Sequence, residues 1–374
     1  MDTSSKDTQP DIQKLPSELQ QLYQQVSKAS LPPNLLEKTE QLIVSLQRLI
    51  KSPQYHAALD DTVRYIDWIT NLPWNTVSQD NLDLEKAQEI LDSTHHSLQV
   101  VKERILEYIA VLALQNEAEK RPEHKKALED LYQRGIGRAP VLLFVGLPGV
   151  GKTSIVHSIA KALNRKFVRI PMGGMGSASQ LRGNPATERT AEPGAIIKAL
   201  RQAQTKNPVI LLDEIDRVAE SVRSDIMGVL LELLDPQQNI RFTDYFINYP
   251  FDLTSVMFIC SANNTRNIAN AVLNRMEVIQ MPGYNDEEKI IIARDYLLPQ
   301  QLLVSGMDKN DVVVDEAVWP IIVRPLGYDA GVRSVARVVE AIVRKCARQR
   351  VSGGAKTYRI TEENYKDFVP EPEI

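Results

Sequence analysis

The sequence predicts an α/β fold in which a parallel sheet has helices on both faces, with a helical segment before it and a small α-helical lid after it. Two observations predict this order. Beyond residue 140, short apolar runs alternate with stretches of helical periodicity, which is the pattern of a parallel sheet covered by helices. Before that point, and again beyond residue 285, apolar residues recur at helical spacing.

Composition limits the classes of protein that the chain can represent. Its 374 residues suffice for two or three domains, and an apolar fraction of 43% is ordinary for a folded protein. The net charge of −4, with acids and bases interspersed, argues against a nucleic-acid partner held by a basic surface. The two cysteines, Cys260 and Cys346, lack the spacing of a disulfide framework or a zinc site, so we expect both to be buried apolar residues.

Targeting and membrane signals are not recognised in the sequence. The N-terminus is polar and acidic, without the apolar stretch of a secretion signal or the arginines of a mitochondrial presequence. No window is apolar for long enough to span a membrane. The sequence therefore predicts a cytoplasmic protein with no membrane partner.

The first third of the chain is expected to be helical. Residues 1–18 are polar and predicted to be flexible, and residues 19–115 form the predicted N-terminal helical segment. Within it, Leu35–Ile50 and Leu84–Leu114 carry the apolar spacing of amphipathic helices. Residues 116–139 are highly charged and are expected to be a solvated insert or linker without chemistry of their own.

Residues 140–284 are predicted to form the α/β domain, and residues 285–374 the α-helical lid. The lid has one strand candidate, Tyr358–Ile360. The predicted strands of the α/β domain are the five short apolar runs Val141–Val145, Lys166–Ile170, Val209–Leu212, Val256–Ser261 and Val278–Met281.

A glycine-rich segment links the first predicted strand to an amphipathic helix. It has the spacing of a P-loop, in which glycines let backbone N–H groups surround phosphate oxygens and the helix N-terminus adds positive partial charge. Lys152 is then expected to reach the β- and γ-phosphates of ATP, and the Thr153 hydroxyl to bind Mg²⁺. A glycine turn without a ligand is the alternative. The predicted nucleotide-binding residues of this segment are Gly146, Leu147, Pro148, Gly149, Val150, Gly151, Lys152, Thr153 and Ser154.

Two carboxylates follow the apolar strand Val209–Leu212. Acids at the tip of a buried strand do nothing for its stability, but they suit phosphoryl-transfer chemistry. We expect Asp213 to support the Mg²⁺ shell and Glu214 to activate the attacking water. Asp216 and Arg217 are expected only to cap or solvate the following turn.

Three further residues are candidates for the catalytic set. Asn263 follows the predicted strand Val256–Ser261, where its amide would orient the attacking water; a turn-forming Asn is the alternative. Arg275 and Arg333 would supply positive charge to the transition state, although each arginine alone also fits a surface charge.

With these residues in place, the chain resembles the ATPase portion of the Lon family of ATP-dependent proteases, which has a P-loop AAA+ fold. The similarity runs from about Glu18 to Asp367, and several stretches are more specific to the family than the P-loop itself. These stretches are Tyr65–Trp68, Leu72–Asn75, Ala87–Asp92, Val101–Tyr108, Leu230–Pro236 and Asn274–Ile279.

The resemblance implies roles for the catalytic candidates. Asn263 matches sensor 1, Arg333 matches sensor 2, and Arg275 matches an arginine finger that acts on ATP held by a neighbouring subunit. A homo-oligomeric ring, a hexamer in this family, follows from that finger. The positions that line the family's adenine pocket are matched by Tyr284, Ile292 and Val332, for which ordinary packing within the lid is the alternative.

The sequence also departs from the family. We find no counterpart of the N-terminal substrate domain, except its closing helix, or of the serine–lysine protease domain, so we expect no peptidase activity. Glu188 and Arg189 stand where the family has an aromatic–aliphatic pair that grips polypeptide. His96 and Ser97 replace a tyrosine–glycine pair near the adenine entry. Aromatic residues at the second pore loop either grip polypeptide or pack beneath the loop: Phe242, Tyr245 and Phe246.

The resulting functional prediction is a Lon-type AAA+ module that couples Mg-ATP hydrolysis to protein remodelling and quality control. Its expected partners are further copies of itself, unfolded proteins, and a separate protease or full-length Lon. A nucleotide-switched regulatory subunit, or a truncated fragment of a full-length Lon protease, is the alternative.

Overall fold

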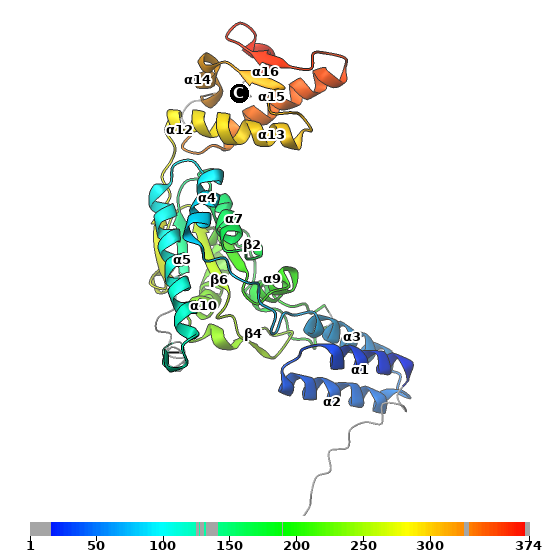
Figure 1. Ribbon diagram of the computed structural model, residues 1–374. Coiled ribbons are helices and arrows are strands. Elements are labelled where there is room, and N and C mark those ends of the chain that lie inside the picture. The colour runs from blue at the N-terminus through cyan, green and yellow to red at the C-terminus, as the bar shows by residue number, and fades with distance from the viewer. Residues whose placement is uncertain are drawn as a thin grey trace, which may run out of the picture.

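The computed structural model describes residues 16–124, 127, 131, 141–188, 190–324 and 329–370. The molecule is elongated, with the N-terminal helices at one end, the sheet in the middle and the C-terminal helices at the other end (Figure 1). The expectation of flexibility for residues 1–18 lies almost entirely outside the described residues. Much of the charged insert at 116–139 lies outside them as well.

The central sheet has five parallel strands in the order β2-β3-β6-β1-β7. The predicted fold class is therefore confirmed. Because all five strands run the same way, their carboxyl ends meet at one edge of the sheet, where the loops after β1, β3 and β6 lie together. The strands are β1 (Val141–Val145), β2 (Phe167–Pro171), β3 (Val209–Asp213), β6 (Met257–Ala262) and β7 (Met276–Gln280).

Two hydrophobic clusters cover the two faces of this sheet. Side chains of β1 alternate between them, with Leu143 and Val145 in one cluster and Leu142 and Phe144 in the other. Burial on both faces explains why the strands are continuous apolar runs. The covering helices are α4 (Leu84–Thr94), α5 (Gln99–Glu119) and α7 (Lys152–Ala162) on one face, and α9 (Ala195–Ala203) and α10 (Arg223–Leu234) on the other.

The N-terminal helices form a bundle with a small apolar cluster of its own. They are α1 (Ser17–Lys28), α2 (Pro33–Leu49) and α3 (Tyr55–Thr70). The helical expectation over Leu84–Leu114 is met by two helices, α4 and α5, with a break between them that the apolar spacing did not indicate. Ser97 and Leu98 both have φ of 59° there, a left-handed conformation that interrupts a helix.

The C-terminal lid has its own core around Trp319. The expected strand Tyr358–Ile360 is present as β9, but it pairs in parallel with a strand that the sequence pattern did not reveal, β8 (Val312–Val314). The lid helices are α12 (Asp286–Ile291), the π-helical turn η5 (Ile292–Leu297), α13 (Leu298–Val304), η6 (Glu316–Val318), α14 (Trp319–Val323), α15 (Arg333–Val351) and α16 (Tyr365–Phe368).

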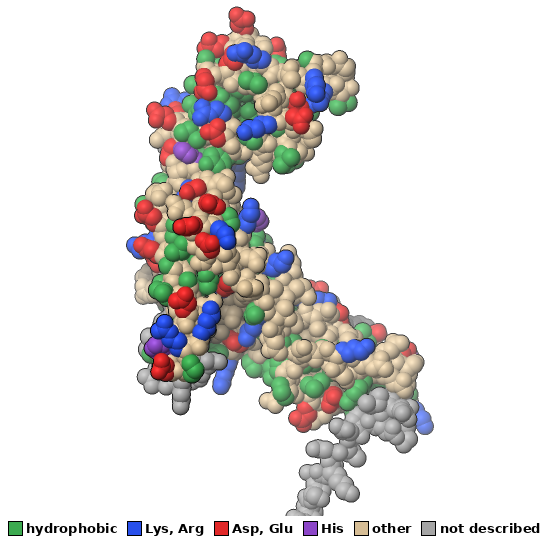
Figure 2. Space-filling view, in the orientation of Figure 1, with side chains coloured by type: hydrophobic (Ala, Val, Ile, Leu, Met, Phe, Trp, Pro, Cys, Tyr) green, Lys and Arg blue, Asp and Glu red, His purple; other side chains and the backbone are tan. Residues whose placement is uncertain are grey.

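Short elements complete the described chain. They are α8 (Ser179–Arg182), η2 (Ile215–Arg217), η3 (Glu220–Val222), η4 (Asn239–Arg241), β4 (Phe242–Thr243), β5 (Pro250–Phe251) and α11 (Asn270–Leu273). Both cysteines are buried and free, as predicted. Among the described helices, none is long and apolar enough to cross a membrane. Figure 2 shows acidic and basic side chains interspersed over one face of the molecule.

Candidate nucleotide site

The glycine-rich segment lies at the carboxyl edge of the sheet, between β1 and α7. Gly149 and Gly151 have φ of 85° and 93°, a region that L side chains rarely adopt. Gly149 also meets the lid closely, since a Cβ placed on it would lie 3.2 Å from the Cβ of Arg333. Glycine is therefore required here both by the turn and by the approach of a second part of the chain.

Lys152 begins α7 and folds back over the loop. Its Nζ donates to the backbone oxygens of Gly146 (2.6 Å) and Leu147 (3.1 Å) and to Oδ1 of Asn263 (3.0 Å). The residue is only 8% exposed. Burial lowers the pKa of Lys152, while the nearby carboxylate of Asp213 acts in the opposite direction. The loop thus presents a desolvated cation at its mouth, which is what binding of phosphate oxygens requires.

Asp213 ends β3 and is held from both sides. Its Oδ1 accepts from the Ser261 hydroxyl on β6, and its Oδ2 accepts from Nε of Arg169 on β2 at 2.6 Å. The carboxylate is 5% exposed, so its position is fixed by these two neighbouring strands. The Ser261 hydroxyl also accepts from the backbone N–H of Glu214 at 3.0 Å, which links the acidic pair to β6.

Glu214 adopts a left-handed backbone conformation, with φ of 59°. Such a conformation costs a non-glycine residue about 1 kcal/mol or more and is concentrated at functional sites. Its side chain is 35% exposed, and its Oε1 lies 3.2 Å from Nη1 of Arg217. The Glu214 carboxylate lies beside Gly173, where an added Cβ would be 3.1 Å from its Oε2.

Asp216 is the main residue that the sequence interpretation misplaced. It was expected to cap or solvate a turn, but it is only 4% exposed. Its Oδ2 accepts from the backbone N–H groups of Asn263 (3.1 Å) and Asn264 (3.3 Å), while its Oδ1 is buried without a hydrogen-bond partner. The η2 turn after the acidic pair therefore holds the loop that carries Asn263. The expectation for Arg217 is also incomplete, because this side chain pairs with Glu214.

Arg275 lies at the amino ends of the strands, opposite the end of the sheet that carries the glycine-rich loop. It directly precedes Met276, which pairs with Val141 at the start of β1, whereas the glycine-rich loop follows the end of that strand. With a rise of about 3.3 Å per residue, five strand residues separate the two ends by roughly 16 Å. The guanidinium is bound instead to the buried carboxylate of Asp235, at 2.9 Å.

The lid packs directly on the glycine-rich loop. The Val332 N–H donates to the Gly149 oxygen (3.1 Å), and the Tyr284 hydroxyl donates to the Val150 oxygen (3.1 Å). Arg333 starts α15 at this contact and has an exposed side chain. Tyr284 and Ile292, two of the predicted adenine-pocket residues, are buried members of one apolar cluster, and the third, Val332, packs against that cluster.

A histidine that was given no role also reaches the loop. His95 Nε2 lies 3.0 Å from the Ser154 hydroxyl, and the ring is 8% exposed. Burial, reinforced by the positive charge of Lys102, lowers the pKa of His95 to about 4, so the imidazole is neutral at pH 7. Next to it, the Ser97 hydroxyl donates to Glu288 of α12 at 2.6 Å, which joins the break between α4 and α5 to the lid.

These residues fit a nucleotide with its magnesium ion. The close contact at Gly149, the desolvated ammonium of Lys152 and the apolar cluster beneath the lid suit phosphates at one end and a base at the other. No group of three or more potential ligands forms a metal cage among the described residues. Mg²⁺ at such a loop needs none, because phosphates and water supply most of its ligands; from this chain, Thr153 and Asp213 are the residues that would hold it.

Comparison with known proteins agrees with this geometry. The model of the ATPase family associated with various cellular activities (AAA) matches residues 142–284. The chain therefore contains an AAA ATPase domain, the class that its fold and its nucleotide site define.

Relatives of the chain extend the match beyond this domain. Lon protease 2 of Thermus thermophilus is 43% identical over 355 residues, covering 95% of this chain and 43% of that protein. Lon protease 1 of Bacillus subtilis is 41% identical over 353 residues, covering 94% of this chain and 43% of that protein. The chain belongs to the Lon family as an AAA+ module, and it spans about two fifths of the length of these relatives.

Proposed function

We propose that this chain binds and hydrolyses Mg-ATP at the site between the glycine-rich loop and the lid. The observation that carries the proposal is the position of Lys152, whose ammonium joins the loop carbonyls to Asn263 beside the acidic pair. In this proposal Lys152 holds the β- and γ-phosphates, Glu214 accepts a proton from the attacking water, and Asn263 orients that water. Magnesium, when bound, neutralises charge on the phosphates.

Hydrolysis is proposed to take place between subunits of a ring, hexameric as in the resemblance described above. The place of Arg275 supports this proposal, because a side chain at the far edge of the sheet cannot reach the phosphates of its own chain. Exposed on the surface, it is available to the site of a neighbouring copy, where it would stabilise transition-state charge. Arg333, at the start of α15, would do the same from within the chain.

The work driven by hydrolysis is proposed to be remodelling of unfolded proteins, handed on to a separate protease or to full-length Lon. We assign no serine–lysine pair in the 374 residues to peptide hydrolysis, and we propose that these residues alone have no peptidase activity. A second candidate, a nucleotide-switched regulatory subunit, is favoured by one observation. Glu188 is exposed at the position where the family has its gripping pair, and a sequence-tolerant grip on polypeptide would need an apolar side chain there.

Steady-state ATP hydrolysis with and without an excess of unfolded protein separates the two candidates. A rate that rises with unfolded protein supports the remodelling role. A steady rate that ignores unfolded protein supports the regulatory subunit and contradicts remodelling. Sedimentation with and without ATP tests the ring, and a chain that stays monomeric under all conditions contradicts catalysis between subunits.

A further inference from the structure

The buried carboxylate of Asp244 lies outside the nucleotide site and has no role in hydrolysis. The residue is 0% exposed and follows β4. Its Oδ1 accepts from the backbone N–H groups of Phe246 (2.8 Å) and Ile247 (3.1 Å), and its Oδ2 accepts from the N–H of Gly194 (2.7 Å). One side chain therefore joins its own turn to a residue fifty positions away.

Gly194 ends a surface loop that begins at Gly183, and the two ends of this loop meet at Asp244. A Cβ placed on Gly183 would lie 2.8 Å from Oδ1 of Asp244 and 2.9 Å from the Gly194 nitrogen. Gly183 also has φ of 76°, so both space and backbone conformation require glycine. On the other side of the junction, the Tyr245 N–H donates to the Arg182 oxygen at 2.7 Å. The turn 244–247 is thus bonded to both ends of the loop.

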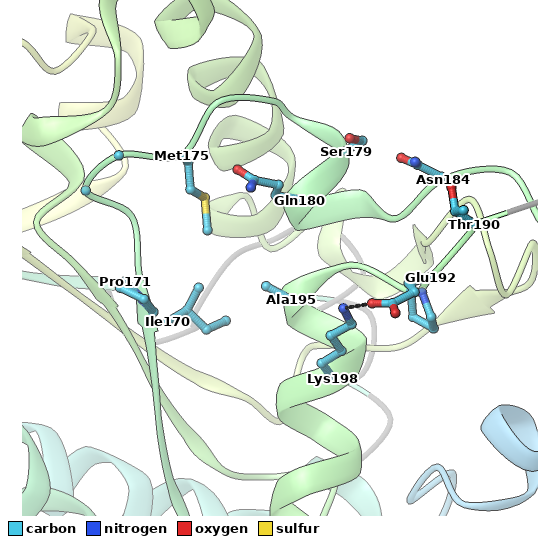
Figure 3. A pocket seen from close by; sticks show the side chains of 13 residues that line it. Ile170, Pro171, Met175, Ser179, Gln180, Asn184, Thr190, Glu192, Ala195 and Lys198 are labelled. Carbon is cyan, nitrogen blue, oxygen red and sulfur yellow. Dashed lines mark hydrogen bonds and ion pairs between the residues drawn. The ribbon is translucent and has the colours of Figure 1, made fainter. Parts of the chain in front are cut away.

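This loop borders a cavity of about 560 Å³ at the edge of the sheet (Figure 3). Asn184, Thr190 and Glu192 line it from the loop side, and Lys198 of α9 lines it from below. Figure 3 shows the Lys198 ammonium directed at the Glu192 carboxylate, with Nζ 2.6 Å from Oε2. Because the loop supplies this wall, the position of its two ends sets the shape of the cavity.

The burial of Asp244 is costly, which argues that its hydrogen bonds have a purpose beyond packing. Burial raises the pKa of Asp244 to about 6, against the three backbone donors and the charge of Arg182, which favour the ionised form. Arg182 is itself paired with Glu232 at 2.8 Å and lies over the ring of Tyr245. An apolar side chain of similar size would fill the same space without the cost of desolvation, but it would leave three buried N–H groups unpaired.

The same loop is connected to the nucleotide site through the end of β2. The Met172 N–H donates to the Asp213 oxygen (2.8 Å), and the Gly174 N–H donates to the Arg217 oxygen (3.3 Å). The segment after β2 then enters α8, which ends at Arg182, directly before the loop. Bonded backbone therefore runs from the acidic pair to the junction at Asp244.

We propose that Asp244 is a positioning residue that locks the ends of the loop from Gly183 to Gly194 onto the turn 244–247, so that both surface segments move as one unit and engage unfolded protein together. The proposal rests on the remodelling function proposed above. Tyr245, 48% exposed on this turn, is the side chain that the lock would hold beside the loop. Phe242 and Phe246 are buried beneath it and serve as packing.

The test compares Asp244→Asn with Asp252→Asn in the full chain. Asp252 is a matched control, because it caps a nearby turn through Thr254 and pairs with Lys206 without touching the loop. Hydrogen exchange of peptides covering 183–194 and 244–248 should accelerate about tenfold or more in Asp244→Asn, the size expected when charge-assisted hydrogen bonds are lost. Basal ATP hydrolysis should stay near wild type in both variants.

The functional measurement is the concentration of unfolded protein that gives half-maximal stimulation of ATP hydrolysis. We expect it to rise about fivefold or more in Asp244→Asn, a change of about 1 kcal/mol, and to stay at the wild-type value in the control. If Asp244→Asn does not fold, Gly183→Ala takes its place in the test, because it pushes a methyl group into the same junction. We expect it to show the same two changes. Wild-type exchange in both segments of both variants would overturn the proposal.

The outcomes separate this proposal from the remodelling function. If the wild-type chain shows no stimulation at any concentration, the remodelling function fails, and hydrogen exchange alone decides the role of Asp244. If stimulation is present and unchanged in Asp244→Asn and Gly183→Ala, the coupling of the two segments to polypeptide is refuted.

Discussion

Substitution of Asp216 by Asn tests how the η2 turn positions Asn263, whose amide is proposed to orient the attacking water. The carboxylate accepts from two backbone N–H groups, those of Asn263 and Asn264, and a hydrogen bond to a charged group contributes about 1.5–3 kcal/mol. An amide oxygen can keep both contacts only as weaker, uncharged bonds. We therefore expect a loss of about 1–3 kcal/mol of the hydrogen-bond free energy that holds Asn263 in place. Since about 1.4 kcal/mol corresponds to a tenfold change in rate, kcat should fall about tenfold to a hundredfold.

Steady-state ATP hydrolysis measures this effect, with KM for ATP as the second readout. KM should change by less than about threefold. Lys152 and the glycine-rich loop, which bind ATP equally in the ground state and the transition state, remain in place. Asp225→Asn is the matched control, since Asp225 is an exposed acid in the first turn of α10. An Asp216→Asn variant that unfolds in urea like wild type and keeps wild-type kcat would show that Asp216 does not position Asn263 for catalysis.

Three further predictions concern catalysis between subunits and pH. Glu214→Gln should leave ATP binding intact and lower turnover by at least about a hundredfold, as loss of a general base does. Hydrolysis near the wild-type rate would show that Glu214 is not the general base. Arg275→Ala should also stop turnover, and mixing it with Glu214→Gln subunits should restore activity; no rescue at any ratio would contradict catalysis between subunits. The pKa of His95 is about 4 in the fold and about 6.5 in the unfolded chain, so between these pH values the unfolded state binds the extra proton. The free energy of unfolding is therefore highest above about pH 6.5 and falls as the pH is lowered toward 4. Relative to His95→Gln, wild type should lose about 2 kcal/mol between pH 7 and 5 in urea unfolding, and parallel curves would contradict the buried neutral imidazole.

The fold was largely predictable because both faces of the sheet are buried. Each strand is then a short apolar run, and the residues at the carboxyl ends, such as Asp213 and Asn263, must meet at one edge. The break between α4 and α5 was not predictable from apolar spacing, since the left-handed residues Ser97 and Leu98 are neither glycine nor proline. The strand β8 was missed because its three residues give too short a pattern.

The missed residues act through tertiary contacts. The sequence gives one indication for Asp216, which is its place three residues after Asp213, close behind an apolar strand. Only the fold shows that it faces the Asn263 backbone. The contact of His95 with Ser154 depends on the break before α5, which the helical pattern concealed. The junction at Asp244 joins segments fifty residues apart, and spacing along the chain does not indicate it.

Hydrolysis of ATP by the purified chain, with Mg²⁺ and with the metal chelated, tests directly whether the glycine-rich loop and the acidic pair form an ATPase site. We expect a steady rate that requires Mg²⁺ and is lost in Lys152→Ala, because that ammonium is the buried cation at the mouth of the loop. A chain that folds and assembles but neither binds nor hydrolyses ATP, or one that hydrolyses it equally well without Lys152, would show that this loop is not the site of ATP hydrolysis.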